Sequence, residues 1–216
     1  MADLIHGTTV SGVVPKILYS FTLESFRITD TRSVHNDTDF VAVSVKVGDN
    51  APITLPTKSM GDVNNGVHKV GLVIPSLNVP PNAVVAFSYS IVNSGHDKDK
   101  VSQALEKVVS AAASKGVSAG AAAVGTIVGG PVGTLITLVG TQAAGWVIEK
   151  LDDIIFANCD GMVAAADHVF TAAQLGQKTA NGAVFRTEDD NKGSNSPRGC
   201  GGNSRYYVTW SAQSHT

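Results

Sequence analysis

The sequence predicts an α+β fold: an antiparallel β-sandwich formed from both ends of the chain, with a glycine-rich α-helical hairpin inserted between them. Two stretches, residues 16–93 and the residues after 160, alternate apolar and polar side chains, which is typical of half-buried strands. Between them, 33 residues from Gly116 to Ile148 carry no formal charge. The predicted organisation of the 216 residues is a first part of the sandwich over 1–98, the insertion over 99–157 and closing strands over 158–216.

The first predicted strand, residues 16–29, shows the alternation most clearly. Its apolar face includes Tyr19 and continues to Leu23. The apolar series resumes at Phe26, after a shift of one residue at Glu24–Ser25. An extra residue in one strand of an antiparallel pair produces a β-bulge, so we predict a bulge at this point.

Further strands follow at short intervals up to residue 93. Residues 39–49 alternate again, and either Phe40 or Val41 begins the inner face. The other candidates are bounded by the Gly, Pro, Asn and Asp residues that favour turns. They are residues 51–60, 66–77 and 82–93. Several short strands at this spacing predict a sandwich or a barrel.

The spacing becomes helical after Asp97. Val101, Leu105 and Val108 recur at intervals of three and four residues, as on one face of a helix. The sequence Gly129-Gly130-Pro131 interrupts this pattern, because proline cannot continue a helix but is well placed in the first turn of the next. We therefore predict an antiparallel pair of helices over residues 100–128 and 131–156.

The chain returns to strand-like alternation after residue 160. The predicted strands are residues 165–175, 182–187 and 204–212. Residues 188–203 are rich in Gly, Ser and Asn and predict a loop. We expect these closing strands to complete the sandwich that the first part of the chain begins.

Composition and termini limit the function classes. Net charge is −2 with no basic stripe, so we expect no nucleic-acid partner. The chain has no P-loop, HExxH or dinucleotide-binding motif, and we predict a protein that is not an enzyme and uses no cofactor. The N-terminus lacks a basic segment followed by an apolar one. We predict synthesis in the cytoplasm without a signal peptide, with release by lysis or a non-classical secretion route left open.

Two smaller sets of residues are candidate sites. Cys159 and Cys200 each lie beside turn residues, and both a disulfide and two free thiols are open. Three carboxylates, Asp30, Asp37 and Asp39, gather between two strands, where they are candidate ligands for a weak Ca²⁺ site. The alternative for these carboxylates is a solvated turn.

The uncharged segment is the strongest functional signal. Gly116 and Gly120 are four residues apart, as are Gly129 and Gly133, a spacing that lets helix backbones approach closely. Each glycine inside a helix costs about 1 kcal/mol relative to alanine in water, so close packing or a low-dielectric surrounding has to offset several of them. A helix without charged residues also lacks the polar face of an ordinary surface helix.

Two ways of burying the uncharged segment remain open. Either the hairpin stays buried inside the protein or a homo-oligomer, or it is stored there and then moves into a lipid bilayer. The uncharged part of the second predicted helix would be about 27 Å long, and the hydrocarbon core of a bilayer is about 30 Å thick. Trp146 and Lys150 at its end are of the types that anchor membrane helices at the interface. In this one feature the segment is similar to the hydrophobic hairpins of bacterial pore-forming toxins.

The leading hypothesis is a soluble, membrane-active protein of the pore-forming or toxin class, whose partners are a lipid membrane, further copies of the chain, and a surface receptor or carbohydrate. The alternative is a non-enzymatic structural or interaction module with a permanently buried hairpin and ligand-binding sandwich loops. A hydrolase would need a cleft that gathers the scattered Asp and His side chains. The residues predicted to form the inserting hairpin are Gly116, Gly120, Gly125, Gly129, Gly130, Pro131, Val132, Gly133, Gly140, Gly145 and Trp146.

Overall fold

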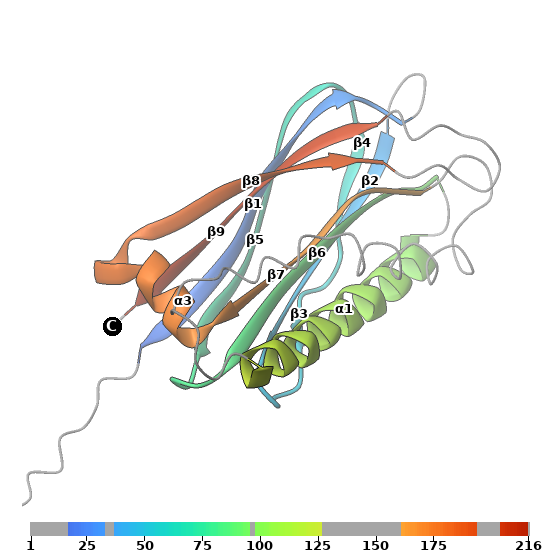
Figure 1. Ribbon diagram of the computed structural model, residues 1–216. Helices are drawn as coiled ribbons and strands as arrows, with labels where there is room; N and C mark the ends of the chain where they lie inside the picture. Colours follow the sequence, from blue (N-terminus) through green and yellow to red (C-terminus); the bar gives the residue numbers. More distant parts are fainter. Residues whose placement is uncertain (1–16, 33–36, 96–97, 127–160, 194–203, 216) are drawn as a thin grey trace, which may run out of the picture.

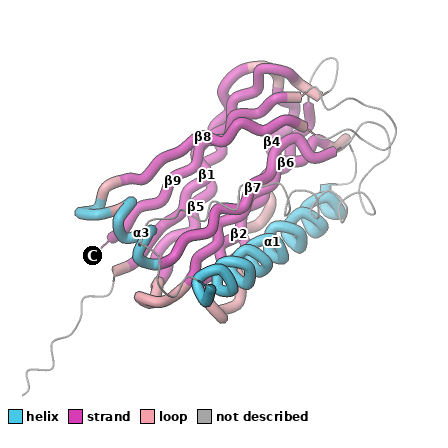
Figure 2. Tube along the Cα trace, viewed as in Figure 1, coloured by secondary structure: helices cyan, strands magenta, loops and turns pink. Residues whose placement is uncertain are grey.

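Two antiparallel β-sheets pack face to face, and one long helix lies on the outside of one of them (Figure 1). We name the four-stranded sheet sheet A and the five-stranded sheet sheet B. The computed structural model describes residues 17–32, 37–95, 98–126, 161–193 and 204–215. Strands make up most of this described chain, as Figure 2 shows by secondary structure.

Sheet A joins the two ends of the chain, in the strand order β5-β1-β9-β8. Its strands are β1 (Leu18–Asp30), β5 (Gly66–Asn78), β8 (Val184–Lys192) and β9 (Arg205–His215). The central strand β1 pairs with both β5 and β9, and in both ladders its register shifts between Leu23 and Ser25. The predicted bulge in the first strand is therefore confirmed.

Sheet B has the strand order β3-β2-β6-β7, with β4 also paired to β2. Its strands are β2 (Asp37–Val47), β3 (Ile53–Thr54), β4 (Lys58–Val63), β6 (Val84–Asn93) and β7 (Gly161–Thr171). The central strand β6 is buried at every residue. A strand buried on both faces has a layer of structure on each side, and here these layers are sheet A and the helix.

The main core fills the space between the two sheets. On β2, Val41, Val43 and Val45 face this core, so the inner face of that strand begins at Val41 rather than at Phe40. Trp210 is the largest fully buried side chain among the described residues. The centroid of its indole ring lies 5.2 Å from that of the Phe87 ring on the opposite sheet. Aromatic contacts at this distance add to the free energy gained from burial.

The predicted fold class is wrong in its helical part. The described residues contain one long helix, α1 (Lys98–Thr126), and no helical hairpin. Helix α1 covers the region predicted for the first arm, and among the described residues it packs on the outer face of sheet B (Figure 1). The second predicted arm, 131–156, lies outside the described residues.

Two local predictions near the C-terminal end also need correction. The end of the strand predicted over 165–175 is a short helix, α3 (Ala172–Lys178), which begins with a capping box between Thr171 and Gln174. The predicted loop 188–203 begins with strand, because β8 continues to Lys192 in unbroken register with β9. The polar residues of β8 suggested a loop, yet every second one faces the core side of sheet A.

Candidate functional site

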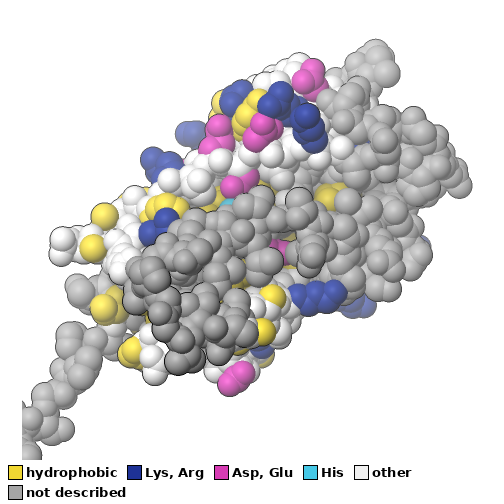
Figure 3. Space-filling view, viewed as in Figure 1, with side chains coloured by type: hydrophobic (Ala, Val, Ile, Leu, Met, Phe, Trp, Pro, Cys, Tyr) yellow, Lys and Arg dark blue, Asp and Glu magenta, His cyan; other side chains and the backbone are white. Residues whose placement is uncertain are grey.

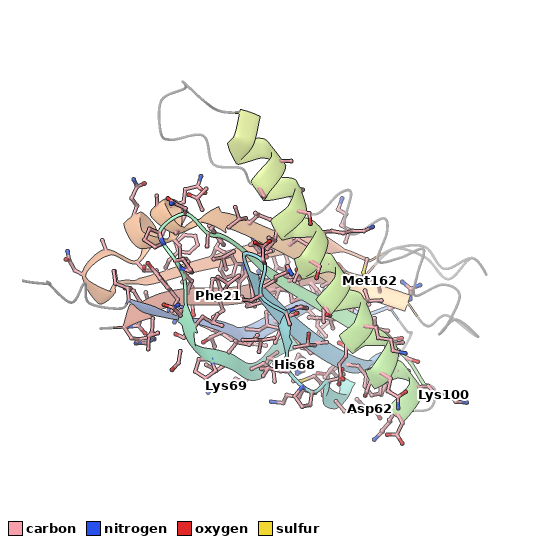
Figure 4. The ribbon with its side chains drawn as sticks, turned by 90° about the horizontal axis from the view of Figure 1, so that it is seen from below. Phe21, Asp62, His68, Lys69, Lys100 and Met162 are labelled. Carbon is pink, nitrogen blue, oxygen red and sulfur yellow. The ribbon has the colours of Figure 1, made fainter. Side chains whose placement is uncertain are left out.

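The contact between α1 and the outer face of sheet B, here called the helix–sheet seam, is the candidate functional site. Helix α1 contributes one continuous buried face to it, and these residues recur at intervals of three and four. Gln103, Lys107, Ser118 and Ala119 on the other side of the helix are exposed. Figure 4, seen from below, shows α1 lying across the outside of the sandwich, with Lys100 near its start. The buried face consists of Val101, Ala104, Leu105, Val108, Val109, Ala112, Ala113, Gly116, Val117 and Gly120.

The apolar contacts of the seam are separate from the main core. One cluster joins the first half of α1, from Val101 to Ala112, to Phe40, Ala42, Val92 and Met162 of sheet B. A smaller cluster joins Val117 to Val84, Ala86 and Val169. The main core between the sheets contains no residue of α1. The sandwich therefore has a core of its own, to which α1 adds an outer layer.

Two of the predicted glycines determine how closely the second half of α1 approaches the sheet. A Cβ atom built on Gly116 would lie 3.0 Å from Cβ of Ala86, and one built on Gly120 would lie 2.7 Å from Cγ1 of Val169. Real Cβ atoms essentially never come as close as the second distance. The spacing of four residues thus serves helix–sheet contact and not the predicted helix–helix contact.

The first half of α1 is tied to sheet B by polar contacts as well. The backbone N–H of Thr57, which precedes β4, donates to Oε1 of Glu106 at 2.8 Å, and the Thr57 hydroxyl donates to the carbonyl of Ser102 at 3.2 Å. Among the described residues no such bond joins the second half of the helix to the sheet. Between the described residues, the seam therefore has more apolar and polar contacts at its start than at its end.

The hydroxyl groups on the outer side of the second half are satisfied within the helix itself. Ser114 donates to the carbonyl of Ser110 at 3.0 Å, and Ser118 donates to the carbonyl of Ser114 at 3.1 Å. Because donor and acceptor belong to the same helix, these bonds persist wherever the helix stays folded, in water or in lipid. This part of α1 can therefore lose its contact with water without leaving these two hydroxyls unpaired.

A polar row interrupts the outer face of sheet B between the two apolar clusters. Along β6, Ser88 and Ser90 lie between Ala86 and Val92, and both serines are at most 1% exposed. Among the described residues, the Ser90 hydroxyl has no hydrogen-bond partner, and the Ser88 hydroxyl interacts weakly with the carboxyl group of Asp167. A buried polar group without a partner costs about 1–3 kcal/mol. The outer face of the sheet therefore matches the apolar helix imperfectly.

Asp167 of β7 lies beside this row, directly opposite Ser88 in the ladder. It is 6% exposed, and burial raises the pKa of its carboxyl group above the usual value. The nearby Ser88 hydroxyl and the charge of His168 lower this pKa in part. Because Asp167 belongs to the same outer face as Val169, its charge is held next to an apolar cluster.

The next residue of β7 points to the opposite face and forms a second polar cluster. Nε2 of His168 lies 2.8 Å from Oδ2 of Asp189 on β8, and the same oxygen accepts bonds from the Tyr89 hydroxyl at 2.8 Å and the Trp210 indole N–H at 3.1 Å. The imidazole ring also lies against the Trp210 ring, with 4.3 Å between centroids. Burial and the charge of Asp189 raise the pKa of Tyr89.

This second cluster joins the edge of sheet B to the edge of sheet A. It gathers one of the scattered Asp–His pairs that a hydrolase would require. Within the described residues, however, no Ser, Thr or Cys side chain hydrogen-bonds to the pair as a nucleophile would. Sequence reasoning missed the cluster, because its members come from β6, β7, β8 and β9, which only the sheet pairing brings together.

The predicted Ca²⁺ ligands are not gathered into one site by the part of the chain described. Asp39 faces the core, where its Oδ2 accepts a 2.9 Å hydrogen bond from the Tyr206 hydroxyl. Asp30 lies exposed at the end of β1. The side chain of Asp37 is outside the description, and no three acidic, His or Cys side chains among the described residues are placed to hold a metal ion.

The other predicted site residues fall mostly beyond the described ranges. Gly125 lies in the last turns of α1. Gly129, Gly130, Pro131, Val132, Gly133, Gly140, Gly145, Trp146, Cys159 and Cys200 lie outside the described residues, so the disulfide stays a prediction. None of the described helices combines the length and the hydropathy that a bilayer-spanning segment needs.

Comparison with known proteins adds no family to this description. No protein-family model matches the chain, and no curated protein matches it.

Proposed function

We propose that this chain is a membrane-active protein in which α1 leaves sheet B and, with the uncharged sequence after it, enters a lipid bilayer. The observation that carries the proposal is the packing of α1 by one face only, outside the main core. A helix packed in this way can leave without opening the core between the sheets. The sandwich then remains folded beside the membrane.

The asymmetry of the seam supports release from its second half. That half has the small cluster around Val117, whereas the first half has the large cluster and the bonds of Thr57. The second half also leads directly into the 33 uncharged residues from Gly116 to Ile148. About 20 apolar residues suffice to cross a bilayer as a helix, so the uncharged run is long enough to supply such a segment.

The imperfect polar match of the seam also supports the proposal. The buried hydroxyl of Ser90 and the buried carboxyl group of Asp167 oppose the docking of an apolar helix. The hydroxyls of Ser114 and Ser118 remain bonded to the helix wherever it goes. Leaving the sheet therefore relieves a cost on the sheet side and creates none at these serines.

A reversible disulfide between α1 and β6 tests the proposal. The pair Gly116→Cys and Ala86→Cys is suitable, because a Cβ at position 116 would lie 3.0 Å from Cβ of Ala86. Disulfides span about 3.5–4.5 Å between Cβ atoms, so a small shift accommodates the bond. Cys159→Ser and Cys200→Ser in the same protein prevent other pairings. Dye release from liposomes is then measured with the oxidised and the reduced form.

We expect the oxidised form to be silent and the reduced form to release dye. The two forms have the same sequence, so reduction controls for any packing defect that the cysteines cause. Equal release by both forms would show that α1 does not need to leave the sheet. If the wild-type protein releases no dye from any liposome, α1 is a permanent layer and the interaction-module alternative is favoured.

A further inference from the structure

The exposed side of α1 differs in charge from the rest of the described surface. The helix carries four lysines, Lys98, Lys100, Lys107 and Lys115, and all four are exposed. Its two acidic residues are Asp99, which is exposed, and Glu106, which is half-buried and accepts the bond from Thr57. Four positive minus two negative charges leave the helix at +2, on a chain whose net charge is −2.

The outer face of sheet A provides the contrast. There three arginines form ion pairs with acidic side chains of other strands in the same sheet: Arg27 with Glu188 at 3.6 Å, Arg186 with Glu24 at 2.9 Å, and Arg205 with Asp190. Figure 3 shows basic and acidic side chains mixed over the upper part of the molecule. On α1, neither Lys98 nor Lys107 makes an ion pair with any described residue.

The order of side chains along α1 suits the boundary of a membrane. Lys107 and Lys115 are eight residues apart, which places them on roughly the same side of the helix about 12 Å from each other. After Lys115 the exposed positions are uncharged and small, namely Ser118, Ala119, Ala121 and Ala122. The exposed side therefore changes from basic to uncharged in the direction of the uncharged run.

We propose that the exposed lysine face of α1, formed by Lys100, Lys107 and Lys115, docks this protein on an anionic lipid surface before the helix leaves sheet B. Positive charge on the helix complements the negative charge of phosphatidylglycerol or phosphatidylserine headgroups. Docking by this face presents the second half of α1, with its uncharged surface, to the bilayer. The inference rests on the proposed function and names the lipid class that it would use.

The test is sedimentation of the full-length protein with vesicles of phosphatidylcholine alone or of phosphatidylcholine mixed with phosphatidylglycerol. We expect binding to the anionic vesicles only, and we expect it to weaken strongly in high salt. Each lysine near an anionic surface contributes about fivefold in affinity. The variant Lys107→Gln/Lys115→Gln should therefore lose roughly 25-fold, and Lys107→Glu alone should lose more than Lys107→Gln.

Lys69→Gln/Lys192→Gln is the matched control, because both side chains are exposed lysines on sheet A. Figure 4 shows Lys69 on β5, well apart from Lys100 on the helix. An equal loss in the control and in the α1 variant would overturn the lysine face as the docking surface. So would equal binding of the wild-type protein to both kinds of vesicle.

Dye release, measured on the same samples, separates this inference from the proposed function. Salt-dependent binding through α1 without dye release supports docking and overturns insertion. Dye release from phosphatidylcholine vesicles that the lysine substitutions leave unchanged supports insertion and overturns docking. Neither binding nor release with either vesicle overturns both.

Discussion

The Tyr206 hydroxyl on β9 donates a 2.9 Å hydrogen bond to Oδ2 of Asp39 on β2 and so links the two sheets through the main core. Both side chains are fully buried. A second bond links the sheets in the opposite sense, from Tyr89 on β6 to Asp189 on β8 at 2.8 Å. Neither bond involves α1. The sandwich therefore has polar as well as apolar contacts that persist when the helix is absent.

Removal of the hydroxyl in Tyr206→Phe should destabilise the whole sandwich. The buried Asp39 carboxyl group loses a donor, and a deficit of this kind costs about 1–3 kcal/mol in the free energy of unfolding. Urea denaturation followed by tryptophan fluorescence measures the change. Tyr207→Phe is the control, because the neighbouring tyrosine points to the outer face of sheet A, where the Arg27 guanidinium lies 3.9 Å from its ring centroid. Equal stability of the Tyr206→Phe and wild-type proteins would contradict the structural role of the bond.

The Asp167→Asn variant should be more stable than the wild type at neutral pH. Burial raises the pKa of Asp167, so the folded state binds its proton more tightly than the unfolded state does. The penalty for the charged form is present above the raised pKa and is relieved as the pH falls through it. The stability difference between variant and wild type should therefore shrink on acidification, as measured by urea unfolding from pH 7.5 down to pH 4.

Asp190→Asn is the control, because the pKa of Asp190 is shifted in the opposite direction to that of Asp167. The hydrogen bond from the Arg205 guanidinium lowers the pKa of Asp190, so its charged form is favoured in the folded state. Loss of that charge should not stabilise the protein at neutral pH. A stabilising effect of both substitutions would indicate a general effect of net charge rather than the burial of Asp167.

The Gly120→Leu variant should loosen the seam and spare the main core. A side chain at position 120 collides with Val169 and Val84, to which a Cβ would approach within 2.7 and 2.8 Å. Overpacking of this kind costs about 1–3 kcal/mol. Amide hydrogen exchange should accelerate in α1 but not in β1 and β9. Under the proposed function, dye release should also become faster.

Ala119→Leu is the matched control for this substitution, because Ala119 is an exposed neighbour on the same helix. It adds the same side chain without a collision with the sheet. Faster exchange in Ala119→Leu as large as that in Gly120→Leu would point to a change in helix propensity and not to the seam.

Alternation and spacing predicted most of the local structure, because these patterns report directly on which face of an element is buried. The bulge at Glu24–Ser25 and the helix beginning near residue 98 are examples. These patterns do not show which other element packs against a buried face. Gly116 and Gly120 show that a close approach is needed, but contact with a helix and contact with Ala86 and Val169 on a sheet require the same spacing.

For two other predictions that the structure corrects, the sequence contains a pattern that indicates the observed structure. Period two in β2 places Asp39 on the same face as Val41 and Val43, which predicts a buried carboxylate rather than a calcium ligand. The Thr171-x-x-Gln174 pattern is a capping box at the start of α3, within residues that otherwise resembled a strand. The polar cluster around Asp189 could not be predicted, because four strands distant in sequence supply it.

The sharpest sequence-level prediction concerns Val132, the midpoint of the uncharged run from Gly116 to Ile148. Val132→Asp divides the run into two stretches of 16 residues, each shorter than the about 20 that span a bilayer. A carboxylate at mid-membrane costs about 2.5–3.5 kcal/mol, so dye release should fall by roughly two orders of magnitude. Val132→Leu keeps the run uncharged and should retain full release. Unfolding curves of both variants establish that the sandwich is intact. Because insertion requires a continuous apolar segment, full release by folded Val132→Asp protein would exclude this run as the inserting segment.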